Sequence, residues 1–159
     1  MSAAIHTTTV ASVEDRDRLA YILAMHLLHF ERQRRLTAIV APTWKQARDV
    51  WDMVAAIATT TTDLVRRISR TRGGEDIETT HGARLICADG AKPNALRGVT
   101  VDRLILLSSD WLTTEQRTIV IPSVFRSPDP HIWEINVAPD RADRIDPSAW
   151  AAAHSEETP

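Results

Sequence analysis

Two neighbouring hydroxyl side chains, Ser108 and Ser109, follow a short apolar run at residues 104–107. Four consecutive aliphatic residues of this kind are typical of a strand that is buried on both faces of a sheet. At the end of such a strand, phosphoryl-transfer chemistry requires carboxylates, one to hold Mg²⁺ and one to polarise the attacking water. Two hydroxyls lack the charge to hold a metal ion and the basicity to accept a proton. Neither serine lies in a Gly-x-Ser-x-Gly turn that would make it a nucleophile. We therefore predict no catalytic residue here.

Other side chains are weaker candidates for a metal site. Asp110 lies two residues beyond Ser108 and shares its face if the strand continues. It is either a displaced metal ligand or, as we favour, a turn or helix-capping residue. His26 and His29 lie one helical turn apart, a spacing that can hold zinc, but no nearby Cys or carboxylate completes a set of ligands. Cys87 stands in a strand-like run and is interpreted as a small core residue in a reducing compartment. The prediction is no metal and no cofactor.

Arginines form two clusters that could contact the phosphates of DNA. The members are Arg32, Arg34 and Arg35 in the first cluster and Arg66, Arg67, Arg70 and Arg72 in the second, with Arg97 as a further candidate. The alternative is a solvated helix end together with strand residues that balance the acidic segment 75–78. The formal net charge of −2 gives no bulk attraction toward nucleic acid or an anionic membrane.

The composition is that of one globular domain. A chain of 159 residues with 43% hydrophobic and 25% charged residues can bury a substantial core. Its apolar runs are too short to span a membrane and its first residues have no secretory pattern, so we expect a cytoplasmic protein without membrane contact. The five tryptophans far outnumber the single tyrosine, and they are assigned either to the core or to an interface.

Hydrophobic periodicity predicts alternating strands and helices. The expected strands are residues 5–11, 36–41, 64–70, 76–80, 83–88, 104–107 and 131–137, and the expected helices are residues 18–34, 44–58, 113–124 and a short one at 147–154. Residues 12–17 read as a polar connection, and Thr43 as the cap of the helix that follows. The pairs Gly73-Gly74 and His81-Gly82 mark turns in a β-rich middle. This alternation favours a mostly parallel sheet covered on both faces.

Three phrases in this order resemble the ATPase domain of the large terminase subunit of tailed bacteriophages, the motor that packages DNA. They are IVAPTWKQARDVW at residues 39–51, ALRGVTVD at 95–102 with LILL at 104–107, and IPS at 121–123 followed by HIWEINVAP at 131–139. The resemblance covers roughly residues 5–140. It implies a three-layer α/β, P-loop-NTPase-like domain over residues 1–140, with a mostly parallel central sheet and a β-hairpin insertion, and a tail at residues 141–159. Because sites in α/β folds open at the carboxyl ends of strands, and the run 104–107 suits a strand buried on both faces, we also expect residues 108–109 at the end of a central parallel strand, beside the strand 5–11 and facing the turn 12–17.

The chain departs from this family at the catalytic positions. The family's first strand leads into a glycine-rich loop ending in Gly-Lys-Ser/Thr, whereas residues 10–18 here contain neither glycine nor lysine. Glu14, Asp15 and Asp17 occupy the start of the helix, where they would repel a triphosphate. Asn136 and Val137 fill the family's coupling position. We expect the family's nuclease domain to be absent, because about 20 residues follow the matched region. The degenerate nucleotide site would comprise Ser12, Glu14, Asp15, Asp17, Ser108, Ser109 and Asp110.

These departures predict a terminase-like pseudo-ATPase of phage or prophage origin that acts by binding. Its expected partner is a packaging-motor subunit, the portal or DNA, and its expected effect is to regulate or block the motor. One alternative is a DNA-binding accessory protein that uses the arginine clusters. Another is a weak nucleotide hydrolase that uses Asp110 and is completed by a partner. A remnant without a selected role is the last alternative.

Overall fold

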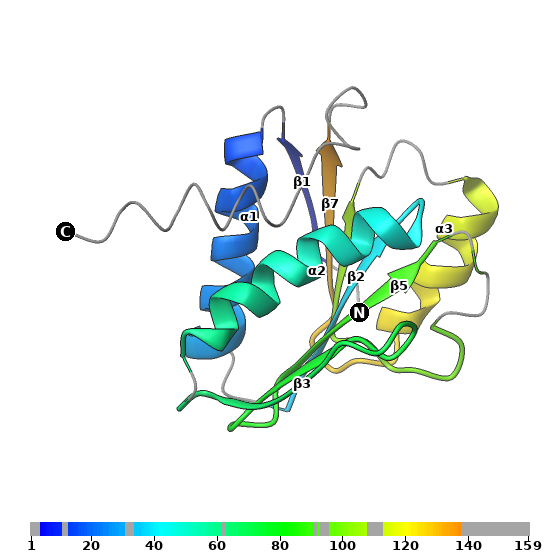
Figure 1. The fold of residues 1–159 in the computed structure, drawn as a ribbon. Coiled ribbons are helices and arrows are strands. Elements are labelled where there is room, and N and C mark those ends of the chain that lie inside the picture. Colours follow the sequence, from blue (N-terminus) through cyan, green and yellow to red (C-terminus); the bar gives the residue numbers. More distant parts are fainter. Residues whose placement is uncertain are drawn as a thin grey trace.

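The protein is an α/β domain whose strands and helices follow one another along the chain (Figure 1). The computed structural model describes residues 4–10, 13–30, 34–61, 63–90, 92, 96–107 and 113–137, with side chains placed at 17–29 and beyond residue 33 up to 135. The elements are β1 (Ala4–Val10), α1 (Val13–Met25), the π-helical turn η1 (His26–Phe30), β2 (Leu36–Ala41), α2 (Trp44–Thr59), β3 (Val65–Ser69), β4 (Asp76–Thr79), β5 (Arg84–Asp89), β6 (Arg103–Leu107), α3 (Thr114–Val120), the 3-10 turn η3 (Ile121–Val124) and β7 (His131–Val137).

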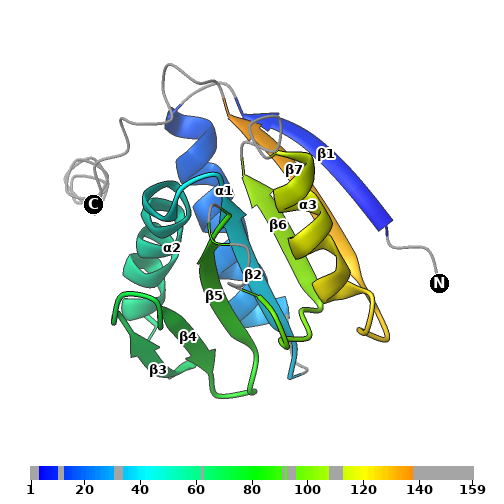
Figure 2. The ribbon, with the colours of Figure 1, turned by 90° about the vertical axis from the view of Figure 1, so that its right-hand side faces the viewer.

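All seven strands belong to one sheet in the order β1-β7-β6-β2-β5-β4-β3. The five strands from β1 to β5 in this order are parallel, and β4 and β3 are added antiparallel as a hairpin at one edge (Figure 2). The predicted mostly parallel sheet with a β-hairpin insertion is therefore confirmed. One detail was wrong, because β7 lies between β1 and β6. The strand that leads to residue 108 is thus not the neighbour of the first strand.

Helices cover both faces of the sheet, α1 and α2 on one face and α3 on the other (Figure 2). Successive side chains of a strand point to opposite faces, so β2 supplies both cores. Ile39 joins Trp51 and other residues of α1 and α2, whereas Val40 joins Val120 of α3. β6 divides in the same way, with Ile105 on the first face and Leu106 on the second. The buried aliphatic run is therefore explained by a strand with a core on each side.

Two helices begin with a capping box, in which the cap hydroxyl and the third helical side chain exchange hydrogen bonds with the backbone. Thr43 and Gln46 form the box of α2, as the sequence predicted for Thr43, and Thr113 and Gln116 form that of α3. The prediction for α1 was wrong at its start. The helix begins at Val13 rather than at 18, because the charged residues assigned to a connection are good helix formers in a first turn. The predicted helix 147–154 lies outside the described residues.

Candidate functional site

The carboxyl ends of the parallel strands are where an α/β domain of this type would hold a nucleotide. β1, β6 and β7 end at this edge, since Val10 pairs with Val137 and Leu107 with Ile135. The segments that carry Ser12 and residues 108–110 follow these strands directly, and they lie outside the described residues. Because β7 stands between β1 and β6, the two segments leave the sheet about 10 Å apart, twice the spacing of neighbouring strands.

The connection between β1 and α1 is short. β1 ends at Val10 and α1 begins at Val13, so residues 11–12 alone join them. A phosphate-binding loop of the Walker type spans about eight residues, whose backbone amides surround the phosphates. Glu14, Asp15 and Asp17 belong to α1 itself. Among these three residues, the structure describes the side chain of Asp17, which is half-buried. The first turns of α1, which two residues separate from the end of β1, therefore carry acidic residues.

The second arginine cluster divides into groups with different partners. Arg66 and Arg67 pair with Glu78, at 3.4 and 3.7 Å, and Arg67 also pairs with Asp76 at 2.8 Å. Arg70 and Arg72 instead lie over the tryptophan rings of α2, and Arg70 approaches an Asp52 oxygen at 3.6 Å. The two arginines of β3 therefore pair with acids of the segment 75–78, as the alternative interpretation of this cluster expects. In the first cluster, Arg32 lies outside the described residues. The exposed Arg97 precedes Gly98, whose φ of 78° suits a tight turn.

A buried carboxylate attaches the β-hairpin insertion to α2. The Glu75 side chain is fully buried and accepts hydrogen bonds from Arg48 at 2.7 Å, from the Trp44 indole at 3.0 Å and from the Gly73 backbone amide at 3.1 Å. Burial acts to raise the pKa of Glu75, but the backbone hydrogen bonds, Arg48 and Trp44 together hold it below its usual value. Arg48 also pairs with Asp52 at 2.9 Å. Sequence reasoning placed Glu75 among surface acids and missed this role.

Cys87 lies close to the same cluster and is a poor nucleophile. Burial, followed by the negative charge of Glu75, raises the pKa of the Cys87 thiol to about 12. Among the residues that the structure describes, no group of three or more His, Cys, Asp or Glu side chains is arranged to hold a metal ion. No helix in the described ranges is long and apolar enough to cross a membrane.

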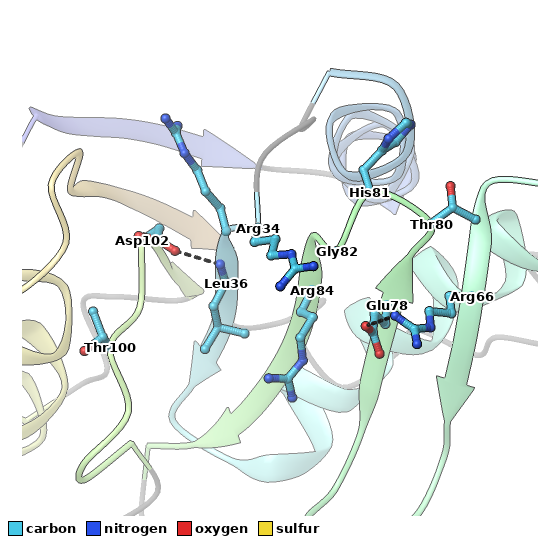
Figure 3. Close-up of a pocket in the computed structure, with 11 residues that line it drawn as sticks. Arg34, Leu36, Arg66, Glu78, Thr80, His81, Gly82, Arg84, Thr100 and Asp102 are labelled. Atoms are coloured by element: carbon cyan, nitrogen blue, oxygen red, sulfur yellow. Dashed lines mark hydrogen bonds and ion pairs between the residues drawn. The ribbon is translucent and has the colours of Figure 1, made fainter.

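A cleft of about 540 Å³ opens at the opposite, amino-terminal edge of the parallel strands (Figure 3). The segments that precede β2, β5 and β6 meet there, together with the β3–β4 hairpin. The lining residues are Arg34, Arg35, Leu36, Arg66, Glu78, Thr80, His81, Gly82, Arg84, Thr100 and Asp102. The cleft thus brings Arg34 and Arg35 of the first cluster together with Arg66 of the second, and it adds Arg84, which the sequence analysis did not single out.

The cleft is held together by Asp102, which joins the starts of three strands. Its two carboxylate oxygens accept hydrogen bonds from the Leu36 amide at 2.8 Å and from the Ser127 hydroxyl at 2.6 Å. Its own amide donates to the Leu36 carbonyl, and its carbonyl accepts from the His131 amide. Both oxygens of this carboxylate are therefore used in the structure of the cleft floor.

Comparison with solved structures identifies the architecture. The ATPase domain of the large terminase of Thermus phage P74-26 matches with a TM-score of 0.63 and 14% identity over 84% of this chain. The large terminase of bacteriophage HK97 matches with a TM-score of 0.72 and 16% identity over 98% of this chain. The large terminase of another, thermophilic bacteriophage matches with a TM-score of 0.63 and 8% identity over 84% of this chain. The chain has the fold of a large terminase ATPase domain.

The HK97 match covers 98% of this chain and therefore includes the insertion between α2 and β5. The chain spans 60% of the length of the Thermus phage domain and 34% of the HK97 protein. No protein-family model and no curated protein sequence matches the chain. At sequence identities of 8–16%, the similarity to these terminases shows a shared fold and does not show a shared activity.

Proposed function

We propose that this chain is a catalytically inactive, terminase-like protein of phage or prophage origin that acts by binding. The observation that carries the proposal is the join between β1 and α1, where residues 11–12 stand in place of a phosphate loop. Oriented backbone amides and a lysine are what such a loop contributes to nucleotide binding. A two-residue join supplies too few amides to surround a triphosphate, and the acidic first turns of α1 oppose its charge.

The strand-end positions support the same proposal. Ser108 and Ser109 follow β6, where a terminase-like motor would need charged metal and water ligands. Phosphoryl transfer requires both a loop that holds the phosphates and ligands for the metal ion and the attacking water, and this chain would lack both. A domain with the shape of the motor and without its chemistry fits a role in which it enters or caps a packaging assembly and regulates or blocks it, with the motor subunit or the portal as partner.

Nucleotide titration tests the loss of binding. Calorimetry with Mg-ATP and Mg-ADP up to about millimolar concentration should detect no micromolar affinity. The control variant neutralises the helix start, Glu14→Gln with Asp15→Asn and Asp17→Asn, and should also fail to bind because the loop is missing. Binding by the parent, reversed by EDTA, contradicts the proposal. Binding by the neutral variant alone would mean that a phosphate cradle persists and that charge merely masks it.

Restoring the metal ligands tests the chemistry. The double variant Ser108→Asp, Ser109→Glu should show no ATP hydrolysis, because metal ligands without a phosphate-holding loop have no bound substrate. It should melt no higher than the parent, since the new carboxylates would lie across β7 from the acids of α1, at about 10 Å, where like charges repel one another weakly. Measurable turnover, or a higher melting temperature, would show that the site is still poised for nucleotide. ATP hydrolysis by the parent chain that needs an added partner would favour the hydrolase completed in trans, with Asp110 as its metal ligand.

The binding role itself is tested with the motor. Purified chain, titrated into the packaging ATPase assay of the large terminase and portal from the same phage, should change the motor's rate and saturate near one chain per motor subunit. An unchanged rate at excess chain would refute a role at the motor. A second candidate function, a DNA-binding accessory protein, is favoured by the gathering of Arg34, Arg35, Arg66 and Arg84 around one cleft.

A further inference from the structure

We infer that the cleft at the amino-terminal edge of the sheet is a phosphate-binding site centred on Arg34. The inference deepens the second candidate function by naming its site, and it does not depend on the fate of the nucleotide site at the other edge. The cleft has a volume of about 540 Å³, within the range of small-ligand sites. Arginine, threonine and histidine side chains from four separate segments line it (Figure 3).

Arg34 is positioned without being neutralised. The hypothetical Cβ of an alanine at position 82 would lie 2.8 Å from Arg34 Cγ, so the glycine is what lets the arginine stem lie against the turn. Gly82 also has a φ of +87°, which other residues rarely adopt. Within the described part of the chain, no carboxylate lies within ion-pair distance of the Arg34 guanidinium. A charged, exposed arginine whose stem is packed at the middle of a cleft is prepared for an anion from outside the domain.

The other arginines are held in fixed orientations by acids behind them. Arg84 bonds to Asp76 through Nε and Nη2, at 2.9 Å for the shorter Nη2 contact. Arg35 pairs with Asp129 through Nη1 at 2.8 Å. A guanidinium carries five N–H donors, and one carboxylate uses about two of them. The ion pairs therefore lower the conformational entropy that these side chains would lose on binding a further oxyanion. In Arg84 the pair with Asp76 uses Nε and Nη2 and leaves the Nη1 group for such a ligand.

The two acids that line the cleft are both engaged by other groups. Asp102 has both oxygens engaged by the Leu36 amide and the Ser127 hydroxyl. Glu78 faces Arg66 at 3.4 Å and Arg67 at 3.7 Å, so two cations compensate its charge. Thr80, His81 and Thr100 add hydroxyl and imidazole groups that can donate hydrogen bonds to phosphate oxygens. The planar arginine fork matches the oxyanion of a phosphate or a carboxylate. Several arginines and hydroxyl groups around one cleft suit a phosphate, which has more acceptor oxygens than a carboxylate.

The phosphate could belong to a nucleic-acid strand or to a free phosphate compound, and the experiment separates these sources. Fluorescence anisotropy measures binding of a labelled single-stranded and a labelled duplex oligonucleotide, with inorganic phosphate as competitor, between about 50 and 200 mM salt. The variants are Arg34→Gln, Arg34→Lys and, as the control of equal charge change, Arg18→Gln. Arg18 is an exposed residue of α1, whose start lies at the opposite edge of the sheet. Melting curves establish that each variant is folded.

We expect Arg34→Gln to weaken oligonucleotide binding about tenfold and to reduce the salt slope by about one, and Arg18→Gln to weaken it less than about twofold. Arg34→Lys should recover part of the loss, since it keeps the charge and loses the fork. If inorganic phosphate displaces the oligonucleotide and binds the chain at least as tightly as the oligonucleotide does, the site is assigned to a free phosphate compound. Equal losses in the Arg34 and Arg18 variants, or no phosphate ligand bound by the parent at low salt, would overturn the inference.

Discussion

Removal of the Glu75 carboxylate should be among the most damaging single changes in the described part of the domain. Its side chain is fully buried and receives hydrogen bonds from Arg48, Trp44 and Gly73. Deleting one member of a buried ion pair costs about 3–5 kcal/mol, because the other charge stays buried without its partner. Arg48 keeps its bond to Asp52 at 2.9 Å, which places Glu75→Ala near the lower limit of that range, about 3 kcal/mol.

Thermal and urea unfolding of matched variants measure this cost. A domain of this size loses about 2–4 °C in melting temperature per kcal/mol, so Glu75→Ala should melt about 6–12 °C below the parent. Glu75→Gln keeps one acceptor oxygen and loses the charge, which predicts about half that effect. The control is Glu78→Ala on β4, the strand that follows Glu75, where a partly exposed residue is removed and the cost should be less than about 1 kcal/mol. Equal costs for Glu75→Ala and Glu78→Ala would refute the reasoning.

Three further outcomes follow from the same side chains. The Glu75 pKa lies below its unfolded value of 4.5, so its contribution to stability is complete above pH 4.5 and is lost as the pH falls through the lower folded value. The difference in melting temperature between the parent and Glu75→Gln should therefore shrink on acidification. The Cys87 thiol, with a pKa of about 12 against 9.0 unfolded, should be about a thousandfold poorer in thiolate near pH 8 than in the unfolded chain, which an alkylation time course in native and denaturing buffer would detect. Asp102→Ala should lower the free energy of unfolding in urea by about 1–3 kcal/mol, because the Leu36 amide would lose its acceptor. Asp102→Asn should cost less, because its side-chain oxygen can still accept a hydrogen bond.

The strands and helices were largely predictable from the sequence. Strand β2 was predicted with its observed bounds because an aliphatic run is closed by Pro42 and followed by a capping threonine. The start of α1 was missed, because acidic residues are equally common in connections and in first helical turns. The π-helical turn η1 left no mark in the periodicity of residues 26–30. Local patterns therefore identify elements, and they are least reliable at the ends.

Spatial relations between distant segments were harder to predict. The placement of residues 108–109 beside β1 was wrong, because β7 pairs with both β1 and β6. The order of strands depends on which strand edges form hydrogen bonds, and an apolar run shows that a strand is buried without showing which strands it pairs with. The cleft escaped prediction because its arginines come from segments near 34, 66 and 84 and are ordinary surface residues in each. Its best signal was the turn at His81-Gly82, where a glycine with φ of +87° makes room for Arg34. The proposed loss of nucleotide chemistry stays a prediction, since residues 108–110 lie outside the described part of the chain.

The strand order also has a kinetic consequence. Hairpins β3–β4 and β4–β5 join residues close in sequence, and α2, which packs on β5, directly precedes them. The pairing of β1 with β7 joins Ala4 to His131, near opposite ends of the described chain. Contacts between distant residues form late, because a long loop must close before they yield any stabilisation. The insertion and α2 should therefore assemble first, and the β1 edge last. On unfolding, β1 would be the first strand to detach, while the rest of the sheet and its helices keep their pairing.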